Sequence, residues 1–251
     1  MQRLGIDIGG SGIKGAPVDL DAGKFAQDRL RIPTPEGGKP ADVARVVAEI
    51  VAHFPDVDGP IGCTFPAVMS NGVALTAANV DASWIGTDAQ ALFEKEAGRK
   101  FVVINDADAA GMAEMRYGAG ADEKGVVLML TLGTGIGSAL FVDGVLVPNT
   151  EFGHLEVNGK EAEHRAAESV REEHDLKWKE WAARLDEVIA AIDRVLWPEL
   201  VMLGGGVSKK SEKFLPHLHP RARVIPAQLL NDAGIIGAAL ATGRSEHPRL
   251  A

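Results

Sequence analysis

Two carboxylates and an asparagine follow a short apolar run near the middle of the chain. The run Phe101–Ile104 is β-branched at three of its four positions, which is typical of a buried strand. Asn105, Asp106 and Asp108 come next and open an alanine-rich segment that favours helix. Each of them suits a helix N-terminus, so one interpretation is that they only cap that helix. The alternative is a ligand site, because open α/β sheets bind ligands beyond the carboxyl ends of their strands.

Three glycine-rich turns each follow an apolar segment, at residues 9–12, 133–137 and 204–206. Glycine allows close approach of the backbone to a ligand, and successive N–H groups in such a turn form an anion site. One such turn is more simply a hairpin, whereas three in this setting indicate phosphate binding. The chain has no Walker A sequence. Residues 133–137 read G-x-G-x-G, so a dinucleotide-binding fold is a poor match.

A basic run follows the third turn. It consists of Lys209, Lys210, Lys213, Arg221 and Arg223, with His217 and His219 between them. Such a run is ordinarily a solvated face. The alternative is contact with a polyanion, because positive clefts concentrate anions. The net charge of −9 for the whole chain argues against general nucleic-acid binding.

Length and composition are those of a globular protein. The 251 residues suffice for one large domain or two lobes, and 46% of them are hydrophobic. No apolar run reaches the roughly 18 residues of a membrane span. The first residues, MQRLGIDIGG, enter a strand without the apolar stretch of a signal peptide. A single cysteine, Cys63, excludes an internal disulfide. We therefore expect a cytoplasmic protein without membrane contact.

Strand and helix patterns alternate along the chain, which favours the α/β class. Strands are expected at residues 4–8, 13–19, 61–64, 101–104, 126–132, 138–142, 200–203 and 224–225. Helices are expected at residues 41–54, 88–97, 177–196 and 231–242, after Gly159 and after the third glycine turn, while residues 71–86 read as irregular. The apolar face of the 177–196 helix suits either the core or a dimer interface.

The two halves of the chain echo each other. Residues 4–9 (LGIDIG) and 128–133 (LMLTLG) stand at a constant offset, and Asp19 matches Asp143 at the same offset. Each half therefore contains a strand, a glycine turn and a returning strand. Apolar–glycine patterns also arise by chance. The alternative is a duplicated protein of two lobes with a cleft between them.

Five segments together resemble the ROK sugar kinases, which are members of the actin/hexokinase-like superfamily. They are residues 7–14 (DIGGSGIK, phosphate motif), 103–110 (VINDADAA, catalytic segment), 132–137 (LGTGIG, second phosphate turn), 151–154 (EFGH, sugar motif E-x-G-H) and 203–207 (LGGGV, nucleotide-side loop). Their order and spacing fit this family over nearly the whole chain.

The resemblance implies an α/β fold with two actin-like, ribonuclease H-like lobes, in which helices flank mixed sheets and a cleft separates the lobes. The small N-terminal lobe would span residues 1–105, with the C-terminal helix at about 231–251 packing back onto it. The larger lobe would span residues 106–230. The family also implies a homodimer.

The chain departs from the common family pattern in two ways. Residues 156–164 contain no cysteine, so no structural zinc is expected, and the first strand begins too early for a preceding winged helix. These departures and the lysine-rich segment 208–216 resemble the branch of the family whose glucokinases use inorganic polyphosphate, with ATP as an alternative donor.

That branch implies transfer of a phosphoryl group to the 6-hydroxyl of glucose, which yields glucose 6-phosphate. Asp106 would be the general base, a role worth about 10²–10⁴-fold in rate. Asp108 would be a structural cap. The expected glucose-binding residues are Asn79, Asn105, Asp106, Glu151, His154 and Glu168.

The expected donor-binding residues surround the glycine turns. They are Asp7, Gly9, Gly10, Ser11, Gly12, Lys14, Thr131, Gly133, Thr134, Gly135, Gly204, Gly205, Gly206 and Lys209. Asp7 would hold Mg²⁺ through water, since this cation retains much of its hydration. A strand-end aspartate and a solvated lysine are the plain alternatives for Asp7 and Lys14. A strictly ATP-dependent kinase for glucose, mannose or an N-acetylated amino sugar, and a sugar-responsive regulator, are the rival functions.

Overall fold

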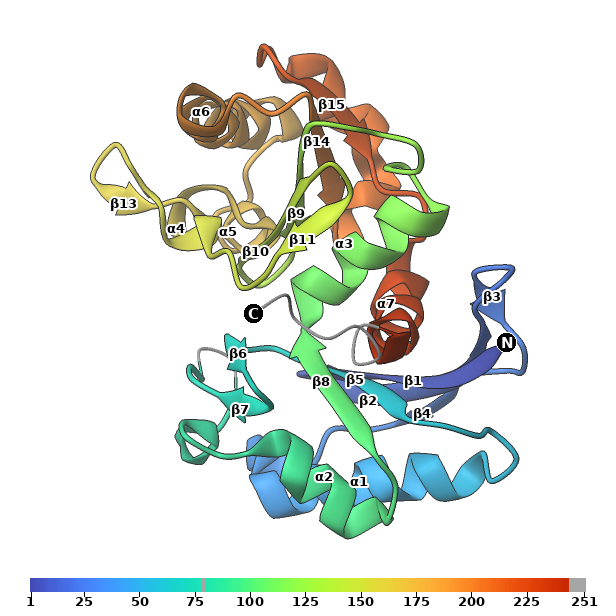
Figure 1. The fold of residues 1–251 in the computed structure, drawn as a ribbon. Helices are drawn as coiled ribbons and strands as arrows, with labels where there is room; N and C mark the ends of the chain where they lie inside the picture. The colour runs from blue at the N-terminus through green and yellow to red at the C-terminus, as the bar shows by residue number, and fades with distance from the viewer. Residues whose placement is uncertain (78–79, 244–251) are drawn as a thin grey trace. The chain divides into compact units, whose positions relative to one another are not determined.

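The computed structural model describes residues 1–77 and 80–243, which divide into two compact units (Figure 1). Unit 1 contains Met1–Ala113 and the chain from Asp232 onward, and unit 2 contains Glu114–Asn231. The lobe boundaries inferred from the resemblance stay a prediction. Among the helices of the described residues, none combines the length and apolarity that a membrane span requires.

A six-stranded mixed sheet forms the centre of unit 1, in the order β3-β2-β1-β5-β8 with β4 also paired to β2. Its strands are β1 (Gln2–Gly9), β2 (Gly12–Asp19), β3 (Lys24–Phe25), β4 (Leu30–Ile32), β5 (Ile61–Phe65) and β8 (Phe101–Asn105). β1 and β2 form an antiparallel hairpin, whereas β1, β5 and β8 are parallel. Every residue of β5 is buried, as expected for a central strand covered on both faces.

Helices cover both faces of this sheet. Figure 1 shows α1 (Pro40–His53) and α2 (Ala89–Ala97) on one face and α7 (Ala233–Ala241) on the other. α1 buries an apolar stripe at helical spacing that includes Val43, Val47 and Ile50. α7 is buried along most of its length, which fits its almost uniformly apolar sequence.

Several shorter elements complete unit 1 and its ends. They are β6 (Met69–Ser70), β7 (Val73–Ala74), η1 (Glu36–Gly38), η2 (Ala82–Trp84) and η6 (Leu230–Asp232). The expectation of an irregular segment at residues 71–86 is wrong in part, because it contains β7, which pairs with the preceding β6, and η2. α3 (Asp106–Tyr117) begins in unit 1 and ends in unit 2.

Unit 2 is built on a five-stranded sheet in the order β11-β10-β9-β14-β15. Its strands are β9 (Val126–Leu132), β10 (Ile136–Val142), β11 (Val145–Val147), β14 (Leu200–Gly204) and β15 (Arg223–Pro226). The other elements are β12 (Glu156–Val157), β13 (Lys160–Glu161), α4 (Glu163–Ala166), α5 (Glu168–Glu173), α6 (Trp178–Leu196), η3 (Phe152–His154), η4 (Gly206–Lys213) and η5 (Leu215–His217). β9 and β10 form an antiparallel hairpin, and β9, β14 and β15 are parallel.

The two sheets therefore share one topology. Each has an antiparallel hairpin whose first strand is followed by two parallel neighbours. The strands of the sequence echo are the first strands of these hairpins. This common arrangement favours duplication over a chance similarity.

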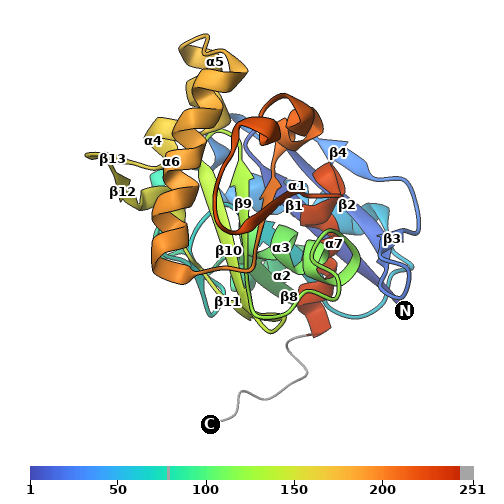
Figure 2. The same cartoon turned by 90° about the horizontal axis from the view of Figure 1, so that it is seen from above.

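The apolar face of α6 is core. Figure 2 shows α6 beside β9 and β10, and Trp181, Leu185 and Val188 are fully buried. They belong to one hydrophobic cluster with residues of β9 and β14. Of the two alternatives that the sequence leaves open for this face, the structure selects the core of unit 2.

The helix predicted after the third glycine turn differs from expectation. η4 is a 3-10 helix, and its backbone is kinked at Lys210 (φ −117°, ψ 25°). The Ser208 hydroxyl donates to the Gly205 carbonyl at 2.7 Å. Such local side-chain bonds compete with the regular helical pattern, which accounts for the irregular turn.

Candidate active site

Asp106 is the first residue of α3 and directly follows β8. Because β8 is the parallel neighbour of β5, the carboxylate lies at the carboxyl end of the parallel strands of unit 1. Asp106 is exposed, and its Oδ1 accepts a hydrogen bond from Ala107 N at 2.8 Å. The location is the one in which α/β sheets present ligand-binding groups.

The helix that begins here is capped by Asn105, and the cap role of Asp108 stays a prediction. Asn105 is buried; its Oδ1 accepts from Asp108 N at 3.0 Å and its Nδ2 donates to the Ala67 carbonyl at 3.1 Å. Asp108 is fully buried inside the first turn of α3. Sequence alone could not distinguish them, because both residue types suit a cap.

Asp7 occupies a polar site at the end of β1. Its Oδ1 accepts from the Thr64 hydroxyl at 2.9 Å, and its Oδ2 lies 3.6 Å from Lys14 Nζ. The Thr64 hydroxyl in turn accepts from Ile8 N at 3.2 Å. Lys14 and Thr64 are the strand partners of Asp7 on either side. The contribution of Thr64 depends on strand register, so no motif in the sequence reveals it.

Two side chains donate hydrogen bonds to carbonyl oxygens of the first glycine turn. Arg31 Nη2 donates to the Ser11 carbonyl at 2.8 Å, and the Thr34 hydroxyl donates to the Gly9 carbonyl at 2.5 Å. Carbonyl oxygens repel phosphate, so engaging two of them with donors favours an anion at this turn. A Cβ at Gly10 would meet no atom within 4 Å, which leaves the turn open for close approach. Neither Arg31 nor Thr34 was among the predicted residues.

The second and third glycine turns lie against each other in unit 2. Gly205 has a φ of 85°, and a Cβ there would stand 2.1 Å from the Leu132 carbonyl oxygen. Only glycine fits this position without displacing the backbone. Thr131 is the strand partner of Gly204, so the donor residues predicted on the two turns are neighbours.

Ser169, at the start of α5, supports the second turn. Its N–H donates to the Gly133 carbonyl at 3.1 Å, and its hydroxyl donates to the Thr134 carbonyl at 2.7 Å. As at the first turn of unit 1, hydrogen-bond donors engage carbonyl oxygens of a glycine turn, here from one side chain and one backbone N–H. Ser169 was not among the predicted residues, since its contact joins segments distant in sequence.

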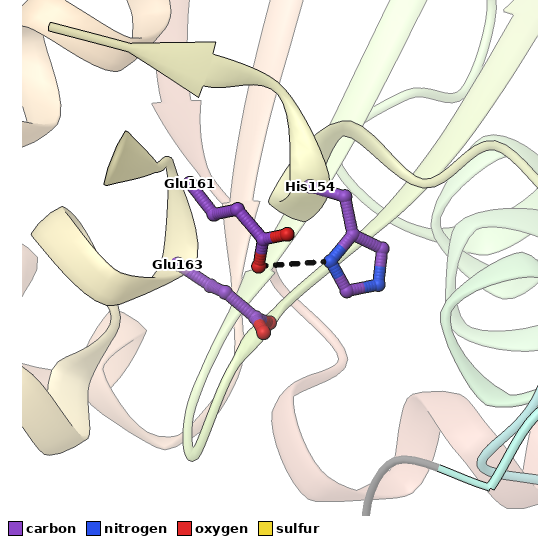
Figure 3. Close-up of side chains that lie close together, drawn as sticks. All are labelled: His154, Glu161 and Glu163. Carbon is purple, nitrogen blue, oxygen red and sulfur yellow. Dashed lines mark hydrogen bonds and ion pairs between the residues drawn. The ribbon is translucent and has the colours of Figure 1, made fainter. Parts of the chain in front are cut away.

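The E-x-G-H motif forms η3 and presents Glu151 and His154 beside β10. A Cβ at Gly153 would lie 2.2 Å from the Ile136 carbonyl oxygen, so the glycine of the motif allows η3 to pass against that strand. His154 Nδ1 lies 3.3 Å from Glu161 Oε2 (Figure 3). Glu163 extends toward the same place, and its Oε2 accepts from Ile136 N at 3.3 Å.

Charge and burial shift the pKa values of this cluster. The hydrogen bond that His154 donates to Glu161 raises the pKa of His154 above its ordinary value. Partial burial opposes this rise, and the charges of Glu163, Glu161 and Glu151 add to it. Glu151 as a residue is exposed, yet partial burial of its carboxyl group raises its pKa; His154 opposes the shift and Glu163 adds to it. The histidine is thereby favoured as a charged donor among acceptor carboxylates.

This cluster also offers the ligand types of a divalent cation. One atom each from His154, Glu161 and Glu163 lies within 4.8 Å of the others. Exposed acidic groups commonly gather without a metal, and the mixture of donor and acceptors suits sugar hydroxyls equally well. The cluster by itself therefore does not indicate a metal centre.

Glu168, predicted to contact the sugar, lies beside the third glycine turn. Its Oε2 would stand 3.6 Å from a Cβ at Gly206. Burial raises the pKa of Glu168, the charge of Glu172 adds to the rise, and Arg171 and Lys210 oppose it. Two carboxylates that were not among the predicted residues, Glu161 and Glu163, lie near His154. Only the packing of the charged segment distinguishes these glutamates.

Each unit thus brings together part of the predicted set. Unit 1 joins Asp7 with Lys14 and places Asn105 and Asp106 at the end of β8. Unit 2 joins the two glycine turns and pairs the E-x-G-H motif with Glu161 and Glu163. Lys209 is exposed on η4. Asn79 lies outside the described residues.

Known proteins resemble this chain over most of its length. Residues 3–168 match the ROK family. The chain is 53% identical over 240 residues to the polyphosphate glucokinase of Mycobacterium tuberculosis, covering 95% of this chain and 90% of that protein. It is 49% identical over 240 residues to the polyphosphate glucokinase of Mycobacterium leprae, covering 95% of this chain and 74% of that protein.

A solved structure gives the same relationship. The inorganic polyphosphate/ATP-glucomannokinase of Arthrobacter sp. strain KM matches with a TM-score of 0.93 at 48% identity, covering 98% of this chain and 99% of that chain. The expected fold class, the actin-like two-lobed α/β fold of ROK sugar kinases, is thereby confirmed. By sequence and by fold, the chain belongs to the ROK family.

Proposed function

We propose that the protein is a phosphotransferase that moves a phosphoryl group from inorganic polyphosphate to the 6-hydroxyl of glucose, giving glucose 6-phosphate. The observation that carries this proposal is the 53% identity, over 95% of the chain, to a polyphosphate glucokinase. The similar solved structure, at 48% identity, is that of a polyphosphate/ATP-glucomannokinase. It supports polyphosphate as the donor and adds ATP as an alternative donor.

Asp106 is the general base in this proposal. A sugar hydroxyl is a weak nucleophile, and a carboxylate that accepts its proton during attack raises the rate by about 10²–10⁴-fold. The exposed position of Asp106 at the end of β8 supports this role. Asn105 orients the segment that carries the base, because its side-chain amide donates to one backbone carbonyl and accepts from one backbone N–H.

Glu151 and His154 bind glucose hydroxyls, and Glu163 joins them as an acceptor. A polyol needs paired donors and acceptors, which a histidine between carboxylates supplies. The raised pKa of His154 supports its role as the donor. The place of Glu168 beside Gly206 favours a role near the donor phosphates over contact with the sugar.

Backbone N–H groups of the glycine turns hold the donor phosphates, together with Lys14, Thr134 and Lys209. Charge develops around the transferring phosphoryl group, so positioning and neutralisation carry most of the catalysis. Mg²⁺, when bound, supplies further neutralising charge. Asp7 fits it through retained water, since both carboxylate oxygens already have protein partners.

A donor panel tests the proposal. Initial rates with glucose are measured with polyphosphate, ATP and GTP at matched Mg²⁺. We expect polyphosphate to give the highest kcat/KM. Turnover with ATP alone would replace the proposal by a strictly ATP-dependent hexokinase, and mannose and N-acetylated amino sugars in the same assay define the acceptor. If none of the three donors supports turnover, the result would favour a sugar-responsive regulator.

The assembly and location of the enzyme complete the proposal. We expect a cytoplasmic homodimer, as the family resemblance implies. Light scattering coupled to size-exclusion chromatography measures the molar mass directly. A monomeric mass at assay concentration would contradict the dimer without affecting the proposed reaction.

A further inference from the structure

We infer that unit 2 carries a second anion subsite, centred on the indole ring of Trp178, that binds the part of a polyphosphate chain extending beyond the glycine turns. The inference rests on the proposed function, because it assigns a site to the same donor. We call Trp178, Arg171, Lys210 and Lys213 the Trp178 platform.

Three cations converge on one ring in the Trp178 platform. The guanidinium carbon of Arg171 lies 4.3 Å from the ring centroid of Trp178. The Nζ atoms of Lys210 and Lys213 lie 5.8 Å and 5.7 Å from the same centroid. These side chains come from α5 and η4, while the ring begins α6. Packing of three elements has therefore concentrated positive charge at one place.

The ring itself is fixed by the core. Trp178 stacks on Phe214 with a centroid distance of 6.2 Å and an interplanar angle of 19°, and Trp181 meets it edge-on at 5.9 Å. Phe214 and Trp181 are fully buried, and Trp181 Nε1 donates to the Ala166 carbonyl at 3.1 Å. The cations thus stand around a rigid surface, which lowers the entropic cost of ordering them on a ligand.

The protein compensates the positive charge only in part: Glu168 interacts electrostatically with Arg171 and Lys210, whereas Lys213 has no such carboxylate partner among the described residues. Arg171 Nη2 also pairs with Glu172 at 3.0 Å; the Arg171 side chain is 14% exposed and the Glu172 side chain 62% exposed. Within residues 1–77 and 80–243, Lys210 and Lys213 form no ion pair, and the buried Nε of Arg171 has no hydrogen-bond partner. Cation–π contacts leave each positive charge intact, so a bound anion relieves the mutual repulsion of the three cations.

The Trp178 platform is close in sequence to the third glycine turn, where the donor phosphates are proposed to bind. η4 starts at Gly206, within the third glycine turn, and carries both lysines. At the rise of a 3-10 helix, Lys210 is roughly 8 Å along the chain from that turn. Glu168, beside Gly206, interacts electrostatically with Arg171 and Lys210. A linear polyanion held at the turn therefore reaches the platform only when it extends beyond its first units.

Chain length is the property that this subsite would sense. ATP ends in a nucleoside after three phosphates, whereas polyphosphate continues with about the same charge per unit. The Trp178 platform accordingly favours long polyphosphate over short oligomers. The attraction is electrostatic, so salt weakens it.

The test compares kcat/KM for a long-chain polyphosphate with that for a short oligomer. In the double variant K210Q/K213Q, we expect the long-to-short ratio to fall by roughly tenfold, as for the loss of a focused positive patch. K24Q/K95Q, which removes two exposed lysines of unit 1, is the charge-matched control and should keep the wild-type ratio. An unchanged ratio in K210Q/K213Q overturns the inference.

A second pair of variants examines the ring. Trp178→Leu removes the surface around which the cations gather, while Trp178→Phe keeps an aromatic face. Calorimetric titration with long-chain polyphosphate, without glucose, should give weaker binding for Trp178→Leu than for Trp178→Phe. Equal affinities for K210Q/K213Q and wild type would reject the subsite even if Trp178→Leu misfolds.

The same measurements separate the two proposals. A wild-type protein that turns over glucose with ATP but not with polyphosphate of any length overturns the proposed donor. A wild-type protein that uses polyphosphate, with a chain-length preference that K210Q/K213Q retains, overturns only the Trp178 platform.

Discussion

At the residue scale, the candidate base Asp106 and its neighbour Asn105 have different roles. Asn105 is buried and engaged by Ala67 and Asp108, whereas Asp106 is exposed. A rigid amide therefore positions the start of α3 while the adjacent carboxylate faces outward. Catalytic groups need this kind of support, because small errors in placement cost large factors in rate.

Replacing Asp106 by Asn should lower kcat by at least about 10²-fold, because the amide cannot accept the hydroxyl proton. Glucose affinity should stay within a few-fold, since the amide keeps the size and hydrogen-bonding capacity of the side chain. A coupled glucose 6-phosphate assay measures the rate, and calorimetry measures binding. Asp56→Asn, an exposed site in unit 1, is the matched control. Undiminished turnover in D106N would remove Asp106 from the mechanism.

The ionised carboxyl group of Glu151, proposed to bind glucose, should lower the folding stability of the protein. Its pKa is raised in the folded state by burial, so folding disfavours the ionised form. The stability of wild type relative to Glu151→Gln should therefore fall as pH rises from below the ordinary value of 4.5 through the raised pKa. Thermal melts of both proteins across this window measure the effect.

Glu151→Gln should weaken glucose binding, although the same substitution is expected to stabilise the fold relative to wild type. Glu151→Gln replaces a charged acceptor by a neutral amide, so the KM for glucose should rise at neutral pH. A melting difference independent of pH would contradict the raised pKa. An unchanged KM would show that Glu151 does not contact the sugar.

At the scale of elements, the glycine turns depend on what packs behind them. Arg31 and Thr34 bind the carbonyls of the first turn, and Ser169 binds those of the second. The third turn is held by direct contact of Gly205 with the backbone of Leu132. In unit 2, the two turns should therefore respond together to a change in either.

Gly205→Ala should destabilise unit 2 by roughly 3 kcal/mol or more, since positive φ and a clash with the Leu132 carbonyl act together. Gly144→Ala is the control: its φ of 79° is similar, and its Cβ would meet no atom within 4 Å. It should cost only about 1 kcal/mol. Denaturant unfolding measures both, and equal costs would show that the contact between the turns is unimportant.

At the scale of the whole molecule, charge is distributed unevenly. The chain carries a net charge of −9, yet Arg171, Lys210 and Lys213 gather around Trp178, close to the third glycine turn. An acidic protein repels polyanions at long range, which leaves recognition of the donor to this local patch. The donor interaction should then be more sensitive to salt than any other step.

Raising the ionic strength from about 0.1 M to about 1 M shortens the Debye length from about 10 Å to about 3 Å. The KM for polyphosphate should rise strongly over this range. The KM for glucose, a neutral molecule, should change little and serves as the internal control. Steady-state kinetics with each substrate varied in turn make the comparison. A salt-independent KM for polyphosphate would exclude electrostatic recognition of the donor.

Local sequence determined the longer strands of both sheets, the glycine turns and most helices of this protein, whereas the short strands β3, β4, β6, β7, β11, β12 and β13 were not predicted. β1 with β2 and β9 with β10 follow from apolar runs joined by glycines, because strand and turn preferences act over a few residues. The order of the motifs was sufficient to predict the family and its fold.

Only the tertiary structure decided which similar side chains meet. It made Asn105 the cap of α3, placed Glu161 and Glu163 beside His154 and Glu168 beside Gly206, and gathered three cations around Trp178. These contacts join segments far apart along the chain, whose residue types are locally interchangeable. Packing and strand register, which no short stretch of sequence contains, select among them.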